Sequence, residues 1–120
     1  MIVRLEKSFR FEAAHRLPKV PKTHKCHNMH GHGFHIEIAL EGEVDPELGW
    51  LVDFQEIKDA WAPLHDQLDH RCLNEIEGLE NPTSENLSRW IWQRLKASLP
   101  LLCEVTVHET CMSRCRYRGQ

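Results

Sequence analysis

The stretch HGHGFHIEIAL, residues 30–40, decides the fold of this 120-residue chain. Its even-numbered positions from 34 to 40 are apolar, while His35 and Glu37 stand between them. A period of two is typical of a β-strand with one buried face. Extended backwards, the same phase includes His30 and His32. The sequence therefore predicts a strand with two histidines at one end of its buried face.

Residues 2–15 alternate in the same way and predict a second strand. Their odd-numbered positions are mostly apolar, and His15 continues that phase. The segment between the two strands, residues 16–29, contains two prolines and short polar residues, which indicates a loop. We expect the strands to pair antiparallel, which brings all three in-phase histidines to one end of the pair.

The rest of the chain predicts two helices and a return to the sheet. Apolar residues at helical spacing follow a capping residue twice. The segments run from Asp53 to Leu68, with Pro63 inside, and from Thr83 or Ser84 to Leu99, before Pro100. Proline is expected to kink or shorten the first helix. Shorter strands are expected at Trp50–Val52, at residues 101–110 with Leu101 and Cys103 on the buried phase, and near residues 116–118.

This order of elements is typical of an α+β domain, in which two helices cover one face of an antiparallel sheet. We expect residues 1–120 to form a single domain. Too little chain remains to cover the other face of the sheet. Further copies of the chain are expected to cover it, so the sequence predicts a homo-oligomer.

Composition argues against several classes of protein. Fifteen Lys and Arg against 18 Asp and Glu give a net charge of −3, which does not favour a nucleic-acid partner. No apolar run approaches the roughly 20 residues of a membrane span, and the charged amino-terminal residues do not resemble a secretory signal. Five cysteines, an odd number, favour reduced thiols. We expect a cytoplasmic protein without a membrane or nucleic-acid partner.

Histidine clustering predicts a metal site. Six of the nine histidines lie within residues 15–35. His30 and His32 on one strand place two imidazoles on one face, about 6.6 Å apart at Cα, and His15 adds a third by its phase. Three neutral imidazoles leave one coordination position open, as in catalytic Zn²⁺ sites. Zinc is favoured over iron, because non-haem iron sites use two histidines and a carboxylate, and no carboxylate stands beside this cluster. The alternative is a set of surface histidines at a strand end.

Four other residues are candidates for chemistry. Cys26 lies in a polar loop four residues before His30, where a metal ion and imidazoles would favour a thiolate acting as nucleophile, base or fourth ligand. Asp69 and His70 form a carboxylate–imidazole pair if a turn lets the neighbours face each other. Glu109 falls on the apolar phase of its strand, so it predicts a buried carboxylate that needs N–H donors.

Five motifs in this order resemble the 6-pyruvoyl-tetrahydropterin synthase family. They are FEAAHRL at 11–17, CxxxHGH at 26–32, LDH at 68–70, NPTSE at 81–85 and ET at 109–110. The short chain and the Cys–His spacing are most similar to the bacterial branch, the 6-carboxy-tetrahydropterin synthases of queuosine biosynthesis. The resemblance runs from about residue 5 to the end of the chain.

The resemblance implies the tunnelling fold, in which subunits join their sheets into a barrel and active sites form at subunit interfaces. It implies a zinc-dependent lyase that converts 7,8-dihydroneopterin triphosphate to 6-carboxy-5,6,7,8-tetrahydropterin, acetaldehyde and triphosphate. The implied roles are zinc binding by His15, His30 and His32, general base for Cys26, proton relay for Asp69 and His70, and pterin binding for Glu109.

Other assignments stay open at this point. Thr83 and Ser84 are candidates for contacting the pterin, and Arg10, Arg16 and Lys25 are candidates for holding the triphosphate. The alternative reaction within the family is pyruvoyl-tetrahydropterin synthesis, which eliminates triphosphate only. A non-catalytic metal- or pterin-binding module and a zinc hydrolase are the alternatives from other classes.

Overall fold

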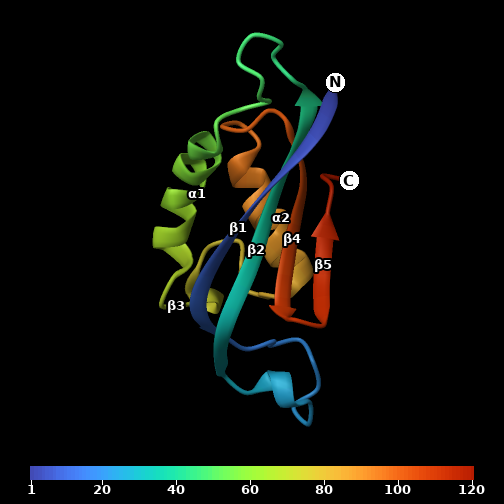
Figure 1. Cartoon of the computed structure of the whole chain (residues 1–120). Helices are drawn as coiled ribbons and strands as arrows, with labels where there is room; N and C mark the ends of the chain where they lie inside the picture. The colour runs from blue at the N-terminus through green and yellow to red at the C-terminus, as the bar shows by residue number, and fades with distance from the viewer.

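Two strands of 14 residues form the centre of the structure, a computed structural model that describes residues 1–120. β1 (Ile2–His15) and β2 (His30–Glu43) pair antiparallel with no break in register, from Ile2 opposite Glu43 to His15 opposite His30. Both strands run the length of the sheet, with a loop beyond each end of the pair (Figure 1). The predicted antiparallel pair is confirmed, and it brings the histidine-bearing ends of the two strands together.

Three shorter strands complete a sheet with the order β3-β1-β2-β4-β5. β4 (Leu102–Thr110) pairs antiparallel with β2, and β5 (Ser113–Tyr117) returns beside β4, starting earlier than the predicted residues 116–118. β3 (Arg71–Cys72) was not predicted, and it pairs parallel with only Ala13 and Ala14 of β1. Most of β1 is therefore a free edge of the sheet.

Both helices pack on one face of this sheet (Figure 1). α1 (Phe54–Leu68) begins after Asp53, whose side chain accepts a hydrogen bond from the Gln55 N–H at 2.9 Å. α2 (Ser84–Leu95) begins after Thr83. The buried side chains of the helices meet the buried face of β2, and the core includes Phe34, Ile36, Ile38, Ile57, Trp61, Leu68, Leu87 and Ile91. The predicted α+β fold is confirmed.

Replacing Thr83 with alanine is expected to lower the free energy of unfolding by about 1 kcal/mol. The Thr83 hydroxyl accepts a hydrogen bond from the Asn86 N–H at 3.1 Å, so its loss leaves one N–H of the first turn of α2 without a partner. Urea unfolding measures the effect. Thr23→Ala, in the exposed loop, is the control and should change stability by less than about 0.5 kcal/mol. Equal stability of the Thr83 variant would contradict the capping role.

Two local predictions were wrong, and a third was wrong in part. Trp50–Val52 is a bend and not a strand, since it closes the turn at the tip of the sheet, where the Asp45 N–H donates to the Trp50 carbonyl at 2.9 Å. α1 runs past Pro63 without shortening. α2 ends at Leu95 and not at Leu99, which stays buried because a turn carries it back to the core.

A β-bulge in β4 explains a fourth error. The register with β2 shifts so that Leu40 faces Leu102 whereas Ala39 faces Glu104, which leaves Cys103 as the extra residue. Leu102 is consequently buried, while Leu101, predicted to be buried, is exposed. Sequence periodicity does not reveal a bulge, because the extra residue reverses the phase without changing the composition.

Next to the bulge, a carboxylate lies among arginines on the sheet face that the helices leave open. Glu104 is buried and forms ion pairs with Arg4, Arg116 and Arg118. Burial by itself raises the pKa of the Glu104 carboxyl, but the hydrogen bonds from Arg118 and Arg4 outweigh it, so the pKa lies below its ordinary value. Glu104 therefore stays ionised at neutral pH.

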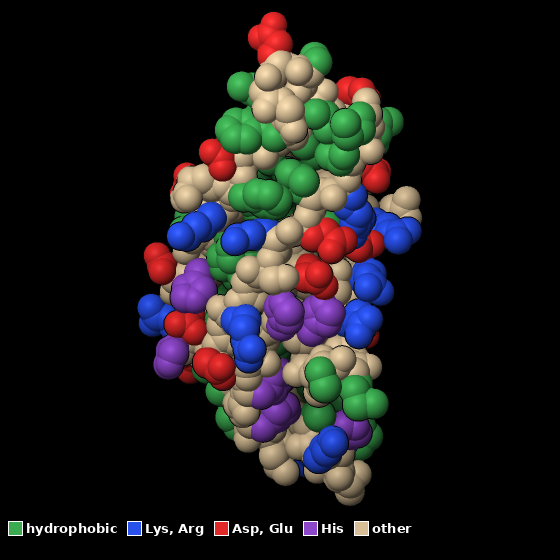
Figure 2. Space-filling view, viewed as in Figure 1, with side chains coloured by type: hydrophobic (Ala, Val, Ile, Leu, Met, Phe, Trp, Pro, Cys, Tyr) green, Lys and Arg blue, Asp and Glu red, His purple; other side chains and the backbone are tan.

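The sheet face that the helices leave open is polar, and the exposed hydrophobic side chains lie mainly at the tip of the molecule. Charged and histidine side chains gather over the middle of the strands, while hydrophobic side chains gather at the tip (Figure 2). On the open face the rings of His35 and His108 stack 5.0 Å apart, and His108 Nε2 lies 2.6 Å from an oxygen of Glu37. Neither helix is long and apolar enough to cross a membrane.

Candidate metal centre and active site

The three histidines predicted to converge do so at the joined ends of β1 and β2. His15, His30 and His32 each offer one ring nitrogen within 4.8 Å of the others. The Nε2 atoms of His15 and His32 are 3.3 Å apart. The phase argument from sequence is confirmed, because the unbroken register of the pair keeps all three side chains on the same face.

Main-chain carbonyls hold the second nitrogen of each ring. The distances from Nδ1 to oxygen are 2.9 Å for His15 and Pro82, 2.8 Å for His30 and Asn28, and 2.9 Å for His32 and Gly33. A carbonyl only accepts hydrogen bonds, so each Nδ1 carries a proton, and in the neutral form of the ring Nε2 is the nitrogen with the free lone pair. Sequence analysis did not find these partners, because every residue has a main-chain carbonyl and the amino-acid type does not show which carbonyls bind a histidine.

This donor set fits a metal ion. His15 is 1% exposed, and burial lowers the pKa of its imidazole despite the hydrogen bond to the Pro82 carbonyl. Neutral imidazole is the form that binds metals. Three fixed nitrogen donors suit a tetrahedral ion with one position left for water or substrate. The cluster can therefore hold a metal ion through its Nε2 atoms.

One cavity joins this cluster to the predicted thiol and carboxylate. It measures about 530 Å³, and its lining includes Cys26, His30, His32 and Glu109. Cys26 is half-buried in the short helix η1 (Lys25–His27), where its N–H donates to the His24 ring at 3.0 Å. The structure thus places a thiol, two imidazoles and a carboxylate around one space large enough for a heterocycle.

Glu109 comes to this cavity from β4 with a partner from α2. The Ser84 hydroxyl donates to Glu109 Oε1 at 2.5 Å. The carboxylate is half-buried, whereas the strand phase predicted a buried one. Its other oxygen stays free to accept a hydrogen bond. Thr83 has a different role from Ser84, since its hydroxyl caps α2.

Asp69 and His70 form the predicted pair at the end of α1. His70 has a φ of 58°, in the left-handed region, and this turn brings its Nδ1 to 2.9 Å from Asp69 Oδ2. The Glu12 N–H donates to the other Asp69 oxygen at 3.0 Å. The hydrogen bonds from Glu12 and His70 hold the pKa of Asp69 below its usual value. The pair is therefore an oriented imidazole beside an ionised carboxylate.

His70 does not reach the Cys26 cavity in this chain. Its side chain is 77% exposed and lines a separate cavity of about 480 Å³ at the β3 edge. The two cavities share Gly31 and His32 of β2. The Asp69–His70 pair and the Cys26 thiol therefore belong to two neighbouring cavities that meet at the histidine-bearing end of β2.

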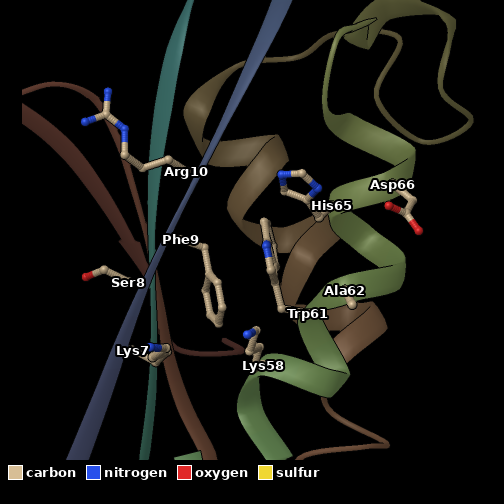
Figure 3. Close-up of a pocket in the computed structure, with 9 residues that line it drawn as sticks. All are labelled: Lys7, Ser8, Phe9, Arg10, Lys58, Trp61, Ala62, His65 and Asp66. Carbon is tan, nitrogen blue, oxygen red and sulfur yellow. The ribbon is translucent and has the colours of Figure 1, made fainter. Parts of the chain in front are cut away.

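A further cavity, of about 400 Å³, lies between the free edge of β1 and α1. Phe9 and Trp61 face each other there with ring centroids 5.2 Å apart, whereas Ser8 and Arg10 point to the other side of the strand (Figure 3). The buried Trp61 Nε1 has no hydrogen-bond partner. No metal-binding cluster occurs at this cavity, so it is distinct from the histidine site.

Comparisons with known proteins agree with this geometry. The family described as 6-pyruvoyl tetrahydropterin synthase matches residues 4–120. A 6-carboxy-5,6,7,8-tetrahydropterin synthase from Synechocystis is 41% identical over 117 residues, covering 92% of this chain and 89% of the relative. A dihydroneopterin monophosphate aldolase from Pyrococcus furiosus is 38% identical over 90 residues, covering 75% of this chain and 72% of the relative. The solved 6-pyruvoyl tetrahydropterin synthase of Caenorhabditis elegans superposes with a TM-score of 0.92 at 32% identity, covering 100% of this chain and 97% of that one.

Proposed function

Because the chain belongs to the 6-pyruvoyl tetrahydropterin synthase family, we propose that it is a zinc-dependent lyase acting on 7,8-dihydroneopterin triphosphate. One water is consumed, and the products are 6-carboxy-5,6,7,8-tetrahydropterin, acetaldehyde and triphosphate, in a cytoplasmic step of queuosine biosynthesis. Similarity to the Synechocystis enzyme supports this product. The observation that carries the proposal is the single cavity lined by Cys26, two of the clustered histidines and Glu109.

The proposed ligands of Zn²⁺ are His15, His30 and His32 through Nε2. When bound, the ion supplies Lewis acidity, which stabilises negative charge on the oxygens of the substrate side chain. The three carbonyl partners support this assignment, since they fix the tautomer that binding requires.

Cys26 is the proposed base. It lies in the same cavity as two of the histidines, and as a thiolate it removes a proton from the three-carbon side chain of the substrate. His70, oriented by the Asp69 carboxylate, relays a proton. In one chain His70 lines a different cavity, which supports an active site formed between subunits.

Glu109 is the proposed pterin anchor. An ionised carboxylate accepts two hydrogen bonds from the amino and ring N–H groups of the pterin, a charge-assisted bidentate contact. The Ser84 hydroxyl donates to one carboxylate oxygen, which restrains the group and leaves the other oxygen for the pterin. Lys25 lines the same cavity, and this favours it over Arg10 and Arg16 as a contact for the triphosphate.

The free edge of β1 is the proposed place where a second copy adds its sheet. The Glu12 N–H donates to Asp69, and the Glu12 carbonyl accepts from the His70 N–H at 2.6 Å, so both polar groups of Glu12 point away from β2. Because β1 has no bulge, the other even-numbered residues also present their N–H and C=O groups at the edge. Such unpaired groups are a template for another strand.

Ser8→Pro is expected to abolish the oligomer without unfolding the chain. Ser8 is even-numbered, so proline removes an N–H that points out of the sheet, and edge strands tolerate this loss. Light scattering after size exclusion should give the mass of one chain, with an unchanged circular dichroism spectrum. Ser8→Ala keeps the N–H and is the matched control, which should stay oligomeric. An oligomeric proline variant would contradict assembly through this edge.

The first test is to incubate the zinc-loaded protein with 7,8-dihydroneopterin triphosphate and to identify products by mass spectrometry. Carboxy-tetrahydropterin with acetaldehyde supports the proposal, and untouched substrate contradicts it. Protein treated with a chelator is the control and should form no product. Dihydroneopterin monophosphate is tested in parallel because the Pyrococcus relative is an aldolase for that compound. Turnover of the monophosphate alone would overturn the assigned substrate.

Pyruvoyl-tetrahydropterin synthesis is the second candidate function. The structural match to the Caenorhabditis elegans enzyme favours it, since that match covers the whole chain. The same metal, base and relay serve both reactions, so the residue assignments do not separate them. The same experiment does, because the pyruvoyl product keeps the three-carbon side chain and releases no acetaldehyde.

A further inference from the structure

Asn74 lies outside the cavities described above, yet it holds the main chain next to His15. It belongs to the short helix η2 (Leu73–Glu75), which follows β3. Its Oδ1 accepts a hydrogen bond from the Arg16 N–H at 3.0 Å, and its Nδ2 donates to the Arg16 carbonyl at 2.9 Å. One side-chain amide thus pairs with both polar groups of the residue after His15, as a neighbouring strand would.

The same amide reaches the segment that provides the second contact of His15. Asn74 Nδ2 also donates to the Glu80 carbonyl at 3.4 Å. Two residues later the Pro82 carbonyl accepts from His15 Nδ1 at 2.9 Å. A closed path therefore runs from His15 through Arg16 and Asn74 to this segment and back to the His15 ring. Because the main chain and Nδ1 of His15 are both held, its two side-chain torsions are restricted and Nε2 points in one direction.

The strand end held by Asn74 also holds the thiol loop. The N–H of Leu17, the residue after Arg16, donates to the Cys26 carbonyl at 2.7 Å. Movement of Arg16 would therefore move Leu17 and with it the short helix that carries Cys26. A ligand of the proposed metal site and the proposed base thus depend on the same three residues of main chain.

We propose that Asn74 is the positioning residue of this site: it aims the His15 imidazole at the metal position and holds the Cys26 loop against the end of β1. Asn74 contacts neither substrate nor metal in this role and acts through Arg16. The inference rests on the proposed function in taking His15 as a metal ligand. It goes further, because it makes metal affinity depend on a residue outside the cluster.

The test is the affinity of the full-length, metal-stripped protein for Zn²⁺, measured by competition with a chromophoric chelator. Asn74→Ala is expected to bind Zn²⁺ about 10- to 100-fold more weakly, the usual loss for residues that orient a ligand. Hydrogen exchange should also become faster at the Leu17 N–H. Wild-type affinity in this variant would overturn the proposal.

Asn74→Asp is the second variant, in case the alanine chain folds poorly. Aspartate has the same shape and still accepts from the Arg16 N–H, but it cannot donate to the Arg16 and Glu80 carbonyls. The added negative charge by itself would strengthen the binding of a cation. Weaker Zn²⁺ binding by this variant would therefore be caused by loss of the Nδ2 hydrogen-bond donor. Binding equal to or tighter than wild type would overturn the proposal.

Leu99→Ala is the control for stability, because Leu99 is buried and follows α2, near the start of β4. It should lower the unfolding temperature while keeping wild-type Zn²⁺ affinity, and a parallel loss of affinity would overturn the proposal. Turnover is not part of this measurement. A chain that binds Zn²⁺ and shows the Asn74 effect but forms no pterin product therefore contradicts the proposed function alone, whereas a wild-type chain that binds no Zn²⁺ overturns both.

Discussion

Replacing Cys26 with alanine is expected to lower kcat about 10²- to 10⁴-fold, the range for loss of a general base. Alanine keeps the loop conformation, since the Cys26 contacts with His24 and Leu17 use main-chain atoms. The half-buried thiol makes no large packing contribution. We therefore expect folding, Zn²⁺ content and KM to change little. Steady-state kinetics gives kcat and KM, and metal analysis and circular dichroism of the same sample give Zn²⁺ content and folding.

Cys111→Ala is the matched control for the thiol. Cys111 is exposed in the turn between β4 and β5 and does not line the Cys26 cavity. Its replacement should leave kcat unchanged. Full turnover by the Cys26 variant would show that another group is the base. A loss of Zn²⁺ in step with the loss of activity would instead identify Cys26 as a ligand.

Replacing His15 with alanine is expected to weaken Zn²⁺ binding by more than about 100-fold, beyond the loss that follows from disturbing an outer partner. The substitution removes one of three nitrogen donors and leaves the buried Pro82 carbonyl without its hydrogen bond. An unpaired buried carbonyl costs about 1–3 kcal/mol, so the unfolding free energy should fall as well. Chelator competition and urea unfolding measure the two effects.

His35→Ala is the control for the metal-site variant. His35 lies on the same strand as two of the clustered histidines but on its open face, where it stacks against His108. Its removal should leave Zn²⁺ affinity unchanged. If both variants lose Zn²⁺ equally, or if the His15 variant keeps it, the assignment of the cluster as the metal site is wrong.

The convergence of the histidines could be predicted because strand periodicity is strict. A side chain two residues along a regular strand returns to the same face, so the phase of Phe34 determined where His30 and His32 would point. The same reasoning failed at Cys103, where the bulge depends on the facing residues of β2. The prediction for Trp50–Val52 failed for another reason, since three apolar residues suit both a strand and a bend whose side chains pack partly against the core.

The parts of the site that escaped prediction depend on tertiary contacts. The two residues of β3 have too little length for a pattern, and they pair only because α1 ends beside β1. Asp69 and His70 were predicted to pair if a turn allowed it, but residue types alone do not predict the left-handed backbone at His70 that makes this turn. Asn74 was overlooked because an asparagine after a leucine is also an ordinary turn residue.

The outer partners of the histidine cluster give the site an unusual mutational robustness. Metal-binding histidines are often oriented by a carboxylate side chain, which one substitution can delete. Here the acceptors are the main-chain carbonyls of Asn28, Gly33 and Pro82, and every amino acid supplies that oxygen. Side chains at these positions can therefore drift without removing an acceptor. Only a change in backbone path disturbs the three rings, so selection on the site acts on the path of the main chain in β2 and in the segments on either side of the cluster.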